Sequence, residues 1–355
     1  MLNTLVIVTP GFPKDENDST CIPERQIFVR VLKETYPQLN IVVVAFQYPL
    51  QPREYNWNGV KVIALGGKNK GGLNRRMTWI GAWQKLKKLN TENRVIGLIS
   101  FWLDECAFIA DKFSKKNHIK HYSWLLGQDA RPGNPYVKRM APKADELIAL
   151  SDSLVDEFKT NYGITPKHVI PGAVDTTLFK HQHQERDIDV LGVGSLIQLK
   201  QYHLFIETIG YLKDHLPNIK TVICGKGPEM KKLKDLVIAH KLEQRVVFKG
   251  ELTHPEILGH MQRSKILLHP SSYEGFSTVL LEALYAGAHV ISFFKPMKAQ
   301  FLHHHIVKDQ EEMNQKILAL LNDNGLDHEP VLVNTMTQMA RSVMQLFPQH
   351  DAVIS

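Results

Sequence analysis

The chain of 355 residues is 43% hydrophobic and 22% charged, with a formal net charge of +7. This composition is typical of a globular protein long enough for two domains, and it excludes disordered and collagen-like chains. No apolar run approaches the roughly 20 residues that cross a bilayer, and the strand-like N-terminal run MLNTLVIVTPG lacks the charged leader of a signal peptide. The three cysteines are too few and too scattered for a disulfide framework or a zinc site, which favours a reducing cytoplasm.

The first half of the chain alternates short apolar runs with amphipathic stretches, which predicts parallel strands connected by helices. Strands are predicted at residues 4–10, 40–46, 60–65, 94–100, 121–127, 146–151 and 168–172. Helices are predicted at residues 23–36, 75–90, 105–116 and 152–163.

A second cycle begins after the polar stretch HQHQERD at 181–187, which is a candidate linker between domains. Strands are predicted at 188–194, 220–227, 245–250, 265–270 and 289–293, and helices at 202–216 and 279–287. A last amphipathic helix at 334–347 is expected to cross back and pack on the first domain. Polar loops follow strands in both halves, as expected of ligand sites at the carboxyl ends of parallel strands.

Two glutamates, Glu274 and Glu282, flank the junction between the apolar run KILLHP and the helix VLLEALYAG. Gly275 allows a tight turn there, and Ser277 is suited to the N-cap of the helix. Backbone N–H groups at a helix N-terminus attract phosphate, so this junction is a candidate binding site. The alternative is that both glutamates are only solvated surface side chains.

Two further loops carry lysines beside glycines. The strand at 188–194 ends in a turn that leads to Lys200, a point charge suited to phosphate. The strand at 220–227 ends in Gly225-Lys226-Gly227, whose glycines let the backbone approach a ligand, although tight turns alone would also explain them. A dinucleotide-dependent oxidoreductase is disfavoured, because G-x-G-x-x-G is incomplete and Cys224-Gly225 stands where an acid for the ribose is expected.

In this order, Gly194-Ser195-Leu196 to Lys200, Gly225-Lys226-Gly227-Pro228 and Glu274 to Glu282 resemble the signature of glycosyltransferase family 4. The segments LIALSDSLVDEF and HVIPGAVDTTLF are similar to interdomain segments of that family, so the resemblance covers most of the chain. It implies the α/β GT-B fold, with two Rossmann-like doubly wound parallel-sheet domains facing a cleft. The expected domains are an acceptor-binding domain at 1–178, on which a C-terminal helix at 334–350 packs, and a nucleotide-sugar-binding domain at 179–333.

The resemblance also implies a role for each matched residue. Lys200 would neutralise the donor diphosphate, Glu282 would hold the ribose hydroxyls, and Glu274 would contact the transferred sugar. The expected catalytic residues are Lys200, Glu274 and Asp129. The expected donor-binding residues are Gly11, Gly194, Ser195, Lys200, Gly225, Lys226, Gly227, Glu274, Gly275, Phe276, Ser277 and Glu282. Transfer would retain the anomeric configuration. No Asp-x-Asp motif lies in the relevant loops, so no metal or other cofactor is expected.

Two departures from the family pattern stand out. Ser195 occupies a position where many members carry an arginine, and Lys226 would have to compensate for the missing charge. Leu126-Gly127-Gln128-Asp129 stands where the N-terminal domain often has His-Gly-x-Asp. Asp129 or Gln128 would then bind a sugar hydroxyl, or Asp129 would only satisfy backbone N–H groups of its own loop.

The segment 66–90 is basic and contains no acidic residue. Its cations are Lys68, Lys70, Arg75, Arg76, Lys85, Lys87 and Lys88. Because Trp79, Ile80 and Trp83 interleave with these charges, the segment is typical of a helix that lies on an anionic membrane surface. The alternative is a helix that buries its tryptophans against the sheet and solvates its lysines.

Nucleic acid and metal are not expected as partners. No nucleic-acid recognition motif accompanies the basic charge. The run His303-His304-His305 looks like a metal site, but adjacent histidines on a helix point in different directions.

The sequence therefore predicts a cytoplasmic, retaining glycosyltransferase that acts on a saccharide or lipid-linked acceptor, in polysaccharide or glycolipid synthesis at the inner face of the membrane. One alternative is a catalytically silent protein that only binds nucleotide sugar, as the departures at Ser195 and Leu126 would allow. The other is a sugar-nucleotide epimerase of the same fold.

Overall fold

The chain divides into two compact units, one formed by Met1–Gly172 with Met336–Ser355 and the other by Ala173–Thr335. The structure, a computed structural model, describes residues 2–179 and 185–347. The division lies ahead of the boundary expected after residue 178, because Val174 already pairs with Thr335 in a parallel bridge of the second unit. Of the expected linker at 181–187, residues 181–184 lie outside the described residues.

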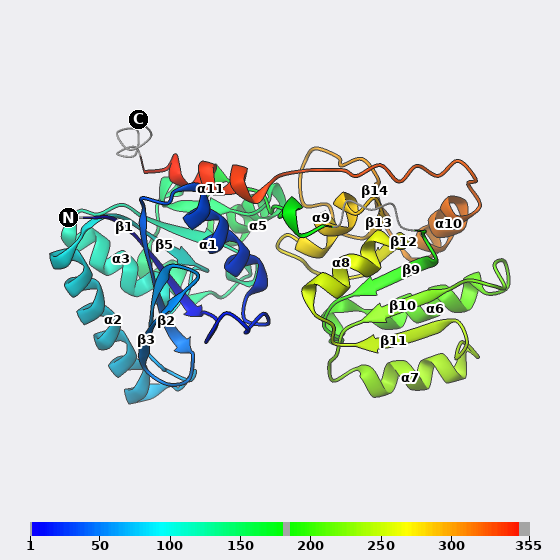
Figure 1. Ribbon diagram of the computed structural model, residues 1–355, viewed down its shortest axis with the longest axis horizontal. Helices are drawn as coiled ribbons and strands as arrows, with labels where there is room; N and C mark the ends of the chain where they lie inside the picture. The colour runs from blue at the N-terminus through cyan, green and yellow to red at the C-terminus, as the bar shows by residue number, and fades with distance from the viewer. Residues whose placement is uncertain (1, 180–184, 348–355) are drawn as a thin grey trace. The chain divides into compact units, whose positions relative to one another are not determined.

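The first unit is built on an eight-stranded sheet with the strand order β3-β4-β2-β1-β5-β6-β7-β8 (Figure 1). Its strands are β1 (Asn3–Gly11), β2 (Asn40–Tyr48), β3 (Arg53–Trp57), β4 (Val60–Ala64), β5 (Arg94–Phe101), β6 (His121–Leu125), β7 (Leu147–Ala149) and β8 (His168–Val169). All neighbouring pairs are parallel except β3 and β4. Central strands such as β1 are buried on both faces, which explains their continuous apolar runs.

Helices cover the first sheet. They are α1 (Pro23–Thr35), α2 (Gly72–Glu92), α3 (Glu105–Asn117), α4 (Pro135–Met140) and α5 (Asp152–Tyr162). α2 and α3 share an apolar core with alternate residues of β1 and β2. The last helix, α11 (Met336–Met344), returns from the second unit and packs on α1 (Figure 1). After α11, the ring of Phe347 lies against Gly97. A Cβ atom added to Gly97 would stand only 2.1 Å from this ring.

The second unit contains a six-stranded, entirely parallel sheet with the order β11-β10-β9-β12-β13-β14. Its strands are β9 (Ile188–Val193), β10 (Thr221–Cys224), β11 (Val246–Gly250), β12 (Ser264–His269), β13 (His289–Ser292) and β14 (His304–Ile306). Its helices are α6 (Tyr202–Leu212), α7 (Met230–Ala239), α8 (His254–Gln262), α9 (Thr278–Tyr285) and α10 (Gln310–Leu321). The predicted fold class, two parallel α/β domains, is confirmed.

Two strands were not predicted from the sequence. β3 pairs with β4 across Asn58-Gly59, both with positive φ, as in a two-residue hairpin. β14 contains His304 and His305, so the expectation of a helix at His303–His305 is wrong, because these residues extend the edge of the sheet beside β13.

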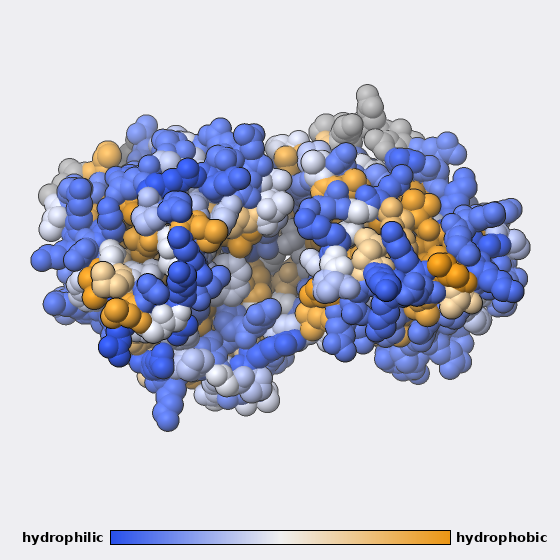
Figure 2. All heavy atoms as spheres, turned by 90° about the horizontal axis from the view of Figure 1, so that it is seen from below, coloured by the Kyte–Doolittle hydropathy of each residue, from blue (hydrophilic) through white to orange (hydrophobic). Residues whose placement is uncertain are grey.

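Within the described ranges, no helix is both long and apolar enough to cross a bilayer. The face shown in Figure 2 is largely polar, with apolar side chains gathered in small islands.

Candidate functional site

The loops that follow β9 and β12 bring the predicted catalytic pair together. Lys200 ends a short 3-10 helix, Gln198–Lys200, and its Nζ lies 2.5 Å from Oε1 of Glu274. The N–H and the hydroxyl of Ser272 donate to the Leu199 carbonyl at 3.0 and 3.1 Å, which ties the two loops to each other. Residues far apart in sequence thus form one polar cluster at the carboxyl edge of the sheet.

A histidine that the sequence analysis did not single out completes this cluster. His269 Nε2, at the end of β12, lies 2.8 Å from the same Oε1 atom of Glu274. Burial opposes the ionisation of Glu274, but the hydrogen bond with His269 and the charges of His269 and Lys200 outweigh it and lower its pKa to about 2. Glu274 is therefore an anion at neutral pH, held by two nitrogen donors.

The helix α9 follows directly, and it presents its N-terminal end without a capping side chain. Ser277 occupies the N-cap position as predicted, but its side chain makes no capping hydrogen bond, and the first turn holds no acidic residue. The positive end of the helix dipole is therefore not neutralised by a residue of the helix itself. Such an end favours an anion. Gly275, Phe276 and Ser277, which lead into the helix, are all buried.

Glu282 lies in the second turn of α9 and is buried. Its Oε1 atom stands 2.7 Å from Nε2 of His254, the first residue of α8. This hydrogen bond, together with the charge of Glu282, raises the pKa of His254 against the effect of burial. His254 is a second residue that sequence reasoning missed, since nothing in its local sequence marks it.

The glycines of the loops after β9 and β10 have another protein segment as their neighbour. A Cβ atom on Gly225 would stand 1.8 Å from the carbonyl oxygen of Gly194, and one on Gly227 would stand 2.3 Å from that of Leu196. The packing of one loop on the other therefore requires these glycines without any ligand. Lys226 forms an ion pair with Glu251, both of them exposed, and Ser195 is exposed as well.

In the first unit, Gly11 and Asp129 line one cavity of about 560 Å³ beside the carboxyl ends of β1, β5 and β6. The Asp129 carboxylate accepts the N–H groups of Leu103, Leu126 and Gly127 at 3.0, 3.1 and 2.9 Å. Burial raises its pKa in spite of these bonds. This geometry agrees with the structural alternative, in which Asp129 holds its own loop together.

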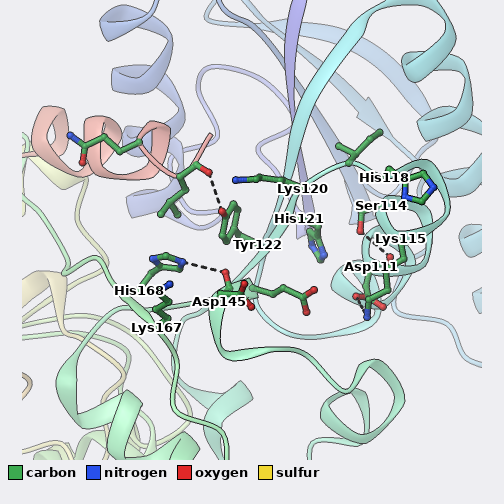
Figure 3. Close-up of a pocket in the computed structure, with 14 residues that line it drawn as sticks. Asp111, Ser114, Lys115, His118, Lys120, His121, Tyr122, Asp145, Lys167 and His168 are labelled. Atoms are coloured by element: carbon green, nitrogen blue, oxygen red, sulfur yellow. Dashed lines mark hydrogen bonds and ion pairs between the residues drawn. The ribbon is translucent and has the colours of Figure 1, made fainter. Parts of the chain in front are cut away.

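A larger cavity of about 750 Å³ lies at the opposite edge of the same sheet. Figure 3 shows Lys120, His121 and Tyr122 at the amino end of β6, with Asp145, Lys167 and His168 beside them. His121 is buried against Ser100, and burial lowers its pKa to about 3. None of the predicted site residues lines this cavity. Ligands of open α/β sheets bind at the carboxyl edge instead.

The tryptophans of the basic segment are partly buried, so they do not form the exposed apolar face that the membrane hypothesis required. The rings of Trp79 and Trp83 pack on Phe108 and Phe113 of α3 with centroids 5.5 and 5.4 Å apart. α2 instead exposes Leu73, Met77 and Ile80, which are 75%, 62% and 52% accessible. These residues are spaced by three and four positions and share one face of the helix.

The histidines at 303–305 belong to a cluster at the edge of the second sheet. His289 stacks on His303 and His305 with ring centroids 4.3 and 5.3 Å apart. Across the part of the chain that the structure describes, no group of three or more His, Cys, Asp or Glu side chains is placed to hold a metal ion.

Comparison with protein families matches residues 174–334 to the model described as "Glycosyl transferases group 1", a range that coincides with the second unit. A component of the phosphatidylinositol N-acetylglucosaminyltransferase of Arabidopsis thaliana is 28% identical over 153 residues, which are 42% of this chain and 34% of that protein. The Campylobacter jejuni enzyme N-acetylgalactosamine-N,N'-diacetylbacillosaminyl-diphospho-undecaprenol 4-alpha-N-acetylgalactosaminyltransferase is 29% identical over 161 residues, 44% of this chain and 43% of that protein. The matches thus span less than half the length of these curated relatives.

The likeness in three dimensions extends over both units. HepE of Anabaena, solved in complex with UDP and glucose, superposes with a TM-score of 0.68 at 15% identity, over 97% of this chain and 95% of that chain. Agreement of this extent at so low an identity is an agreement of fold.

Proposed function

Because residues 174–334 belong to the glycosyl transferases group 1 and the two units have the GT-B fold, we propose that this protein transfers a sugar from a nucleoside diphosphate to a saccharide or lipid-linked acceptor. Relatives whose names include phosphatidylinositol and diphospho-undecaprenol support such an acceptor, and the fold neighbour that holds UDP and glucose supports such a donor. The role belongs to polysaccharide or glycolipid synthesis.

The observation that carries the proposal is the meeting of Lys200 and Glu274 beside the uncapped N-terminus of α9. An ammonium group has three donors, and the bond to Glu274 uses one of them, so Lys200 keeps donors for a phosphate. The N–H groups of the first turn of α9 add further positive potential. The diphosphate of the donor binds between the lysine and the helix end.

The two glutamates hold the sugar parts of the donor. Glu282, anchored through His254, accepts hydrogen bonds from the ribose hydroxyls. Glu274, kept ionised by Lys200 and His269, accepts one from a hydroxyl of the transferred sugar. A carboxylate offers about four lone-pair sites, so each glutamate retains sites beyond its protein contacts.

The transfer itself follows from this placement. As the bond between the sugar and the diphosphate breaks, negative charge grows on the phosphate oxygens, and Lys200 and the α9 N–H groups stabilise it without a metal ion. The departing diphosphate takes the proton of the acceptor hydroxyl, which attacks from the same face. The anomeric configuration is thereby retained, and no side chain acts as a nucleophile.

The assignment is tested on donor binding and transfer. Thermal stabilisation of the full chain by a panel of nucleoside diphosphates and their sugars identifies the donor, because a ligand of the native state raises its stability. Lys200→Ala and Glu282→Ala should weaken that stabilisation and abolish transfer, while Lys232→Ala, an exposed lysine of α7, serves as the control. Transfer by Lys200→Ala at the wild-type rate would refute the proposal. Binding without transfer would indicate a silent protein, and conversion of the donor without acceptor would indicate an epimerase.

We further propose that α2 contacts an anionic membrane surface, now through Leu73, Met77 and Ile80 with the basic residues of 66–90 around them. Vesicles that contain phosphatidylglycerol should sediment the wild-type chain, and Met77→Glu should reduce the bound fraction. Ile238→Glu changes a comparably exposed residue of the second unit and should have no effect. If vesicles of neutral phosphatidylcholine alone sedimented the chain as well as those with phosphatidylglycerol, the proposed attraction between the basic residues and anionic lipid would be contradicted.

A further inference from the structure

A basic groove lies beside the starts of β9, β10 and β11, at the edge of the second sheet opposite the proposed donor site. Its cavity measures about 290 Å³. The ionisable side chains that line it are Asp187, Lys220, Arg245, Lys249, His260 and Arg263. Asp187 is the one acid among the described lining residues, so the charge of the groove favours an anion as its ligand.

The groove exists because β11 leaves one row of its side chains uncovered. β11 is an edge strand of the second sheet (Figure 1). Its side chains alternate between the two faces: Val246 and Phe248 pack in the core with α6 and α7, whereas Val247 and Lys249 are exposed. α8 packs on β9 and β12, and its His260 forms part of the opposite wall.

The acid of the groove is already neutralised by a protein partner. The Asp187 carboxylate accepts two hydrogen bonds from Arg263, one of them from Nε at 2.8 Å. These bonds chiefly lower the pKa of Asp187, so it is an anion paired with Arg263. Asp189, the next acid along the chain, forms an ion pair with Lys265 at 2.8 Å. Neither carboxylate is then left to balance the other cations of the groove.

Arg245 is the most firmly placed of these remaining cations. Its carbonyl accepts the N–H and the hydroxyl of Thr221 at 2.9 and 2.8 Å, which fixes its backbone just before β11. Its Nε–H is buried and has no hydrogen-bond partner among the described residues. A buried donor without a partner lowers stability unless a ligand or ion completes it. Lys220 and Lys249 are exposed in the same groove and form no ion pair in the described part of the chain.

Protection of the sheet edge is the alternative explanation for these charges. Edge strands often carry lysines that prevent pairing with another chain. That role accounts for Lys249, but not for Arg245 with its buried Nε–H, nor for Lys220, which precedes the inner strand β10. A bound anion accounts for all three residues.

We propose that the basic groove binds the phosphate groups of a small phosphorylated molecule. A guanidinium donates two parallel hydrogen bonds to a phosphate and lysines add point charges, so Arg245, Lys220 and Lys249 together match a ligand with more than one phosphate. The volume is at the small end of ligand pockets, which favours a small molecule. A membrane is a poorer match, because Val247 is the one exposed large apolar side chain among the described lining residues. The inference does not depend on the proposed transferase function.

Inorganic diphosphate is the probe, and isothermal titration calorimetry on the full chain measures its binding. Because diphosphate would also bind beside Lys200, the parent and all variants carry Lys200→Ala. The parent should bind diphosphate, and Arg245→Gln should weaken binding about tenfold or more, because it removes a charged hydrogen bond. Lys249→Gln should weaken binding as well, and since Lys249 is exposed, this change tests the groove even if Arg245→Gln destabilises the chain. Lys232→Gln, which changes an exposed lysine of α7, should bind as the parent does.

The proposal is refuted if the parent does not bind diphosphate, or if Arg245→Gln and Lys249→Gln bind it as tightly as the parent. Sedimentation with vesicles that contain phosphatidic acid separates a lipid headgroup from a free phosphate. Met77→Glu is added in this experiment to weaken the proposed contact of α2 with lipid. If these vesicles sediment the chain in a manner that depends on Arg245 while diphosphate does not bind, the groove recognises a lipid and the small-molecule proposal falls.

Discussion

Replacing Glu274 by glutamine measures how much the contacts of the Glu274 carboxylate with Lys200 and His269 stabilise the second unit. The depression of its pKa from 4.5 to about 2 corresponds to about 3 kcal/mol of native-state stability. Glutamine keeps the shape of the side chain but behaves as a permanently protonated glutamate. We therefore expect Glu274→Gln to unfold at neutral pH with about 3 kcal/mol less free energy than the wild type.

The sign of the pH dependence follows from the direction of the shift. Because the folded pKa is lowered, the contribution is fully present above 4.5 and is lost as pH falls towards about 2. The difference between wild type and Glu274→Gln should therefore be flat from neutral pH down to about 5 and more than half lost at about pH 3.

Urea unfolding followed by circular dichroism measures this difference. All five tryptophans lie between Trp57 and Trp124, so tryptophan fluorescence reports the first unit and serves as an internal control. Glu251→Gln breaks an exposed ion pair with Lys226 and should change stability by less than about 1 kcal/mol. A loss for Glu274→Gln as small as that of Glu251→Gln, or one that does not vary with pH, would refute the reasoning.

Three further outcomes are expected. Gly225→Ala places a Cβ atom 1.8 Å from a backbone carbonyl oxygen, at a residue with φ of 150°, and should lower the free energy of unfolding in urea by more than about 2 kcal/mol. Gly259→Ala, inside α8 with open space around it, should leave that free energy unchanged or raise it. Equal effects of the two substitutions would contradict the packing of the loops. Because the pKa of His254 is raised in the folded state, its bond to Glu282 stabilises the fold below pH 6.5, and this stabilisation is lost as pH rises through the folded-state pKa. His254→Gln should therefore lower the melting temperature more at about pH 5.5 than at about pH 8.5. A loss that does not vary with pH would contradict this role of His254. Ending the chain after Thr335 removes the buried face of α11 and should lower the free energy of unfolding seen by tryptophan fluorescence by several kcal/mol, and an unchanged value would show that α11 is dispensable.

The parallel sheets and the Lys200–Glu274 cluster could be predicted because their signals are local. Strands buried on both faces appear as continuous apolar runs, and the lysine and glutamate each follow such a run, which places them at one edge of the sheet. The resemblance to glycosyltransferase family 4 that these motifs indicated is confirmed by the match of residues 174–334 to the group 1 model.

Other parts of the site depended on contacts that local sequence does not encode. His254 reaches Glu282 from a different helix, and only the fold brings them within 2.7 Å. The loop glycines were consistent with room for a ligand or with tight turns alone, and the structure packs Gly225 against Gly194 and Gly227 against Leu196. The catalytic role of Asp129 stays a prediction. Its carboxylate accepts three backbone N–H groups, and these hydrogen bonds hold its loop in place.

Two features of the first unit were not predicted, for different reasons. The Asn58-Gly59 pair is a strong hairpin signal that would have revealed β3. The exposed face of α2 could not be chosen from periodicity, because tryptophans and aliphatic residues alternate around the helix and only packing on α3 decides which of them are buried.

The return of α11 to the first unit sets an order of events during synthesis. A ribosome completes the polypeptide of residues 1–172 long before it adds Met336, so the first unit waits for its last helix while the whole second unit emerges. Until then, the α1 surface on which α11 packs and the Gly97 site that receives Phe347 are exposed to solvent. The unit made first is therefore the one finished last, and it needs protection from aggregation for the longest time.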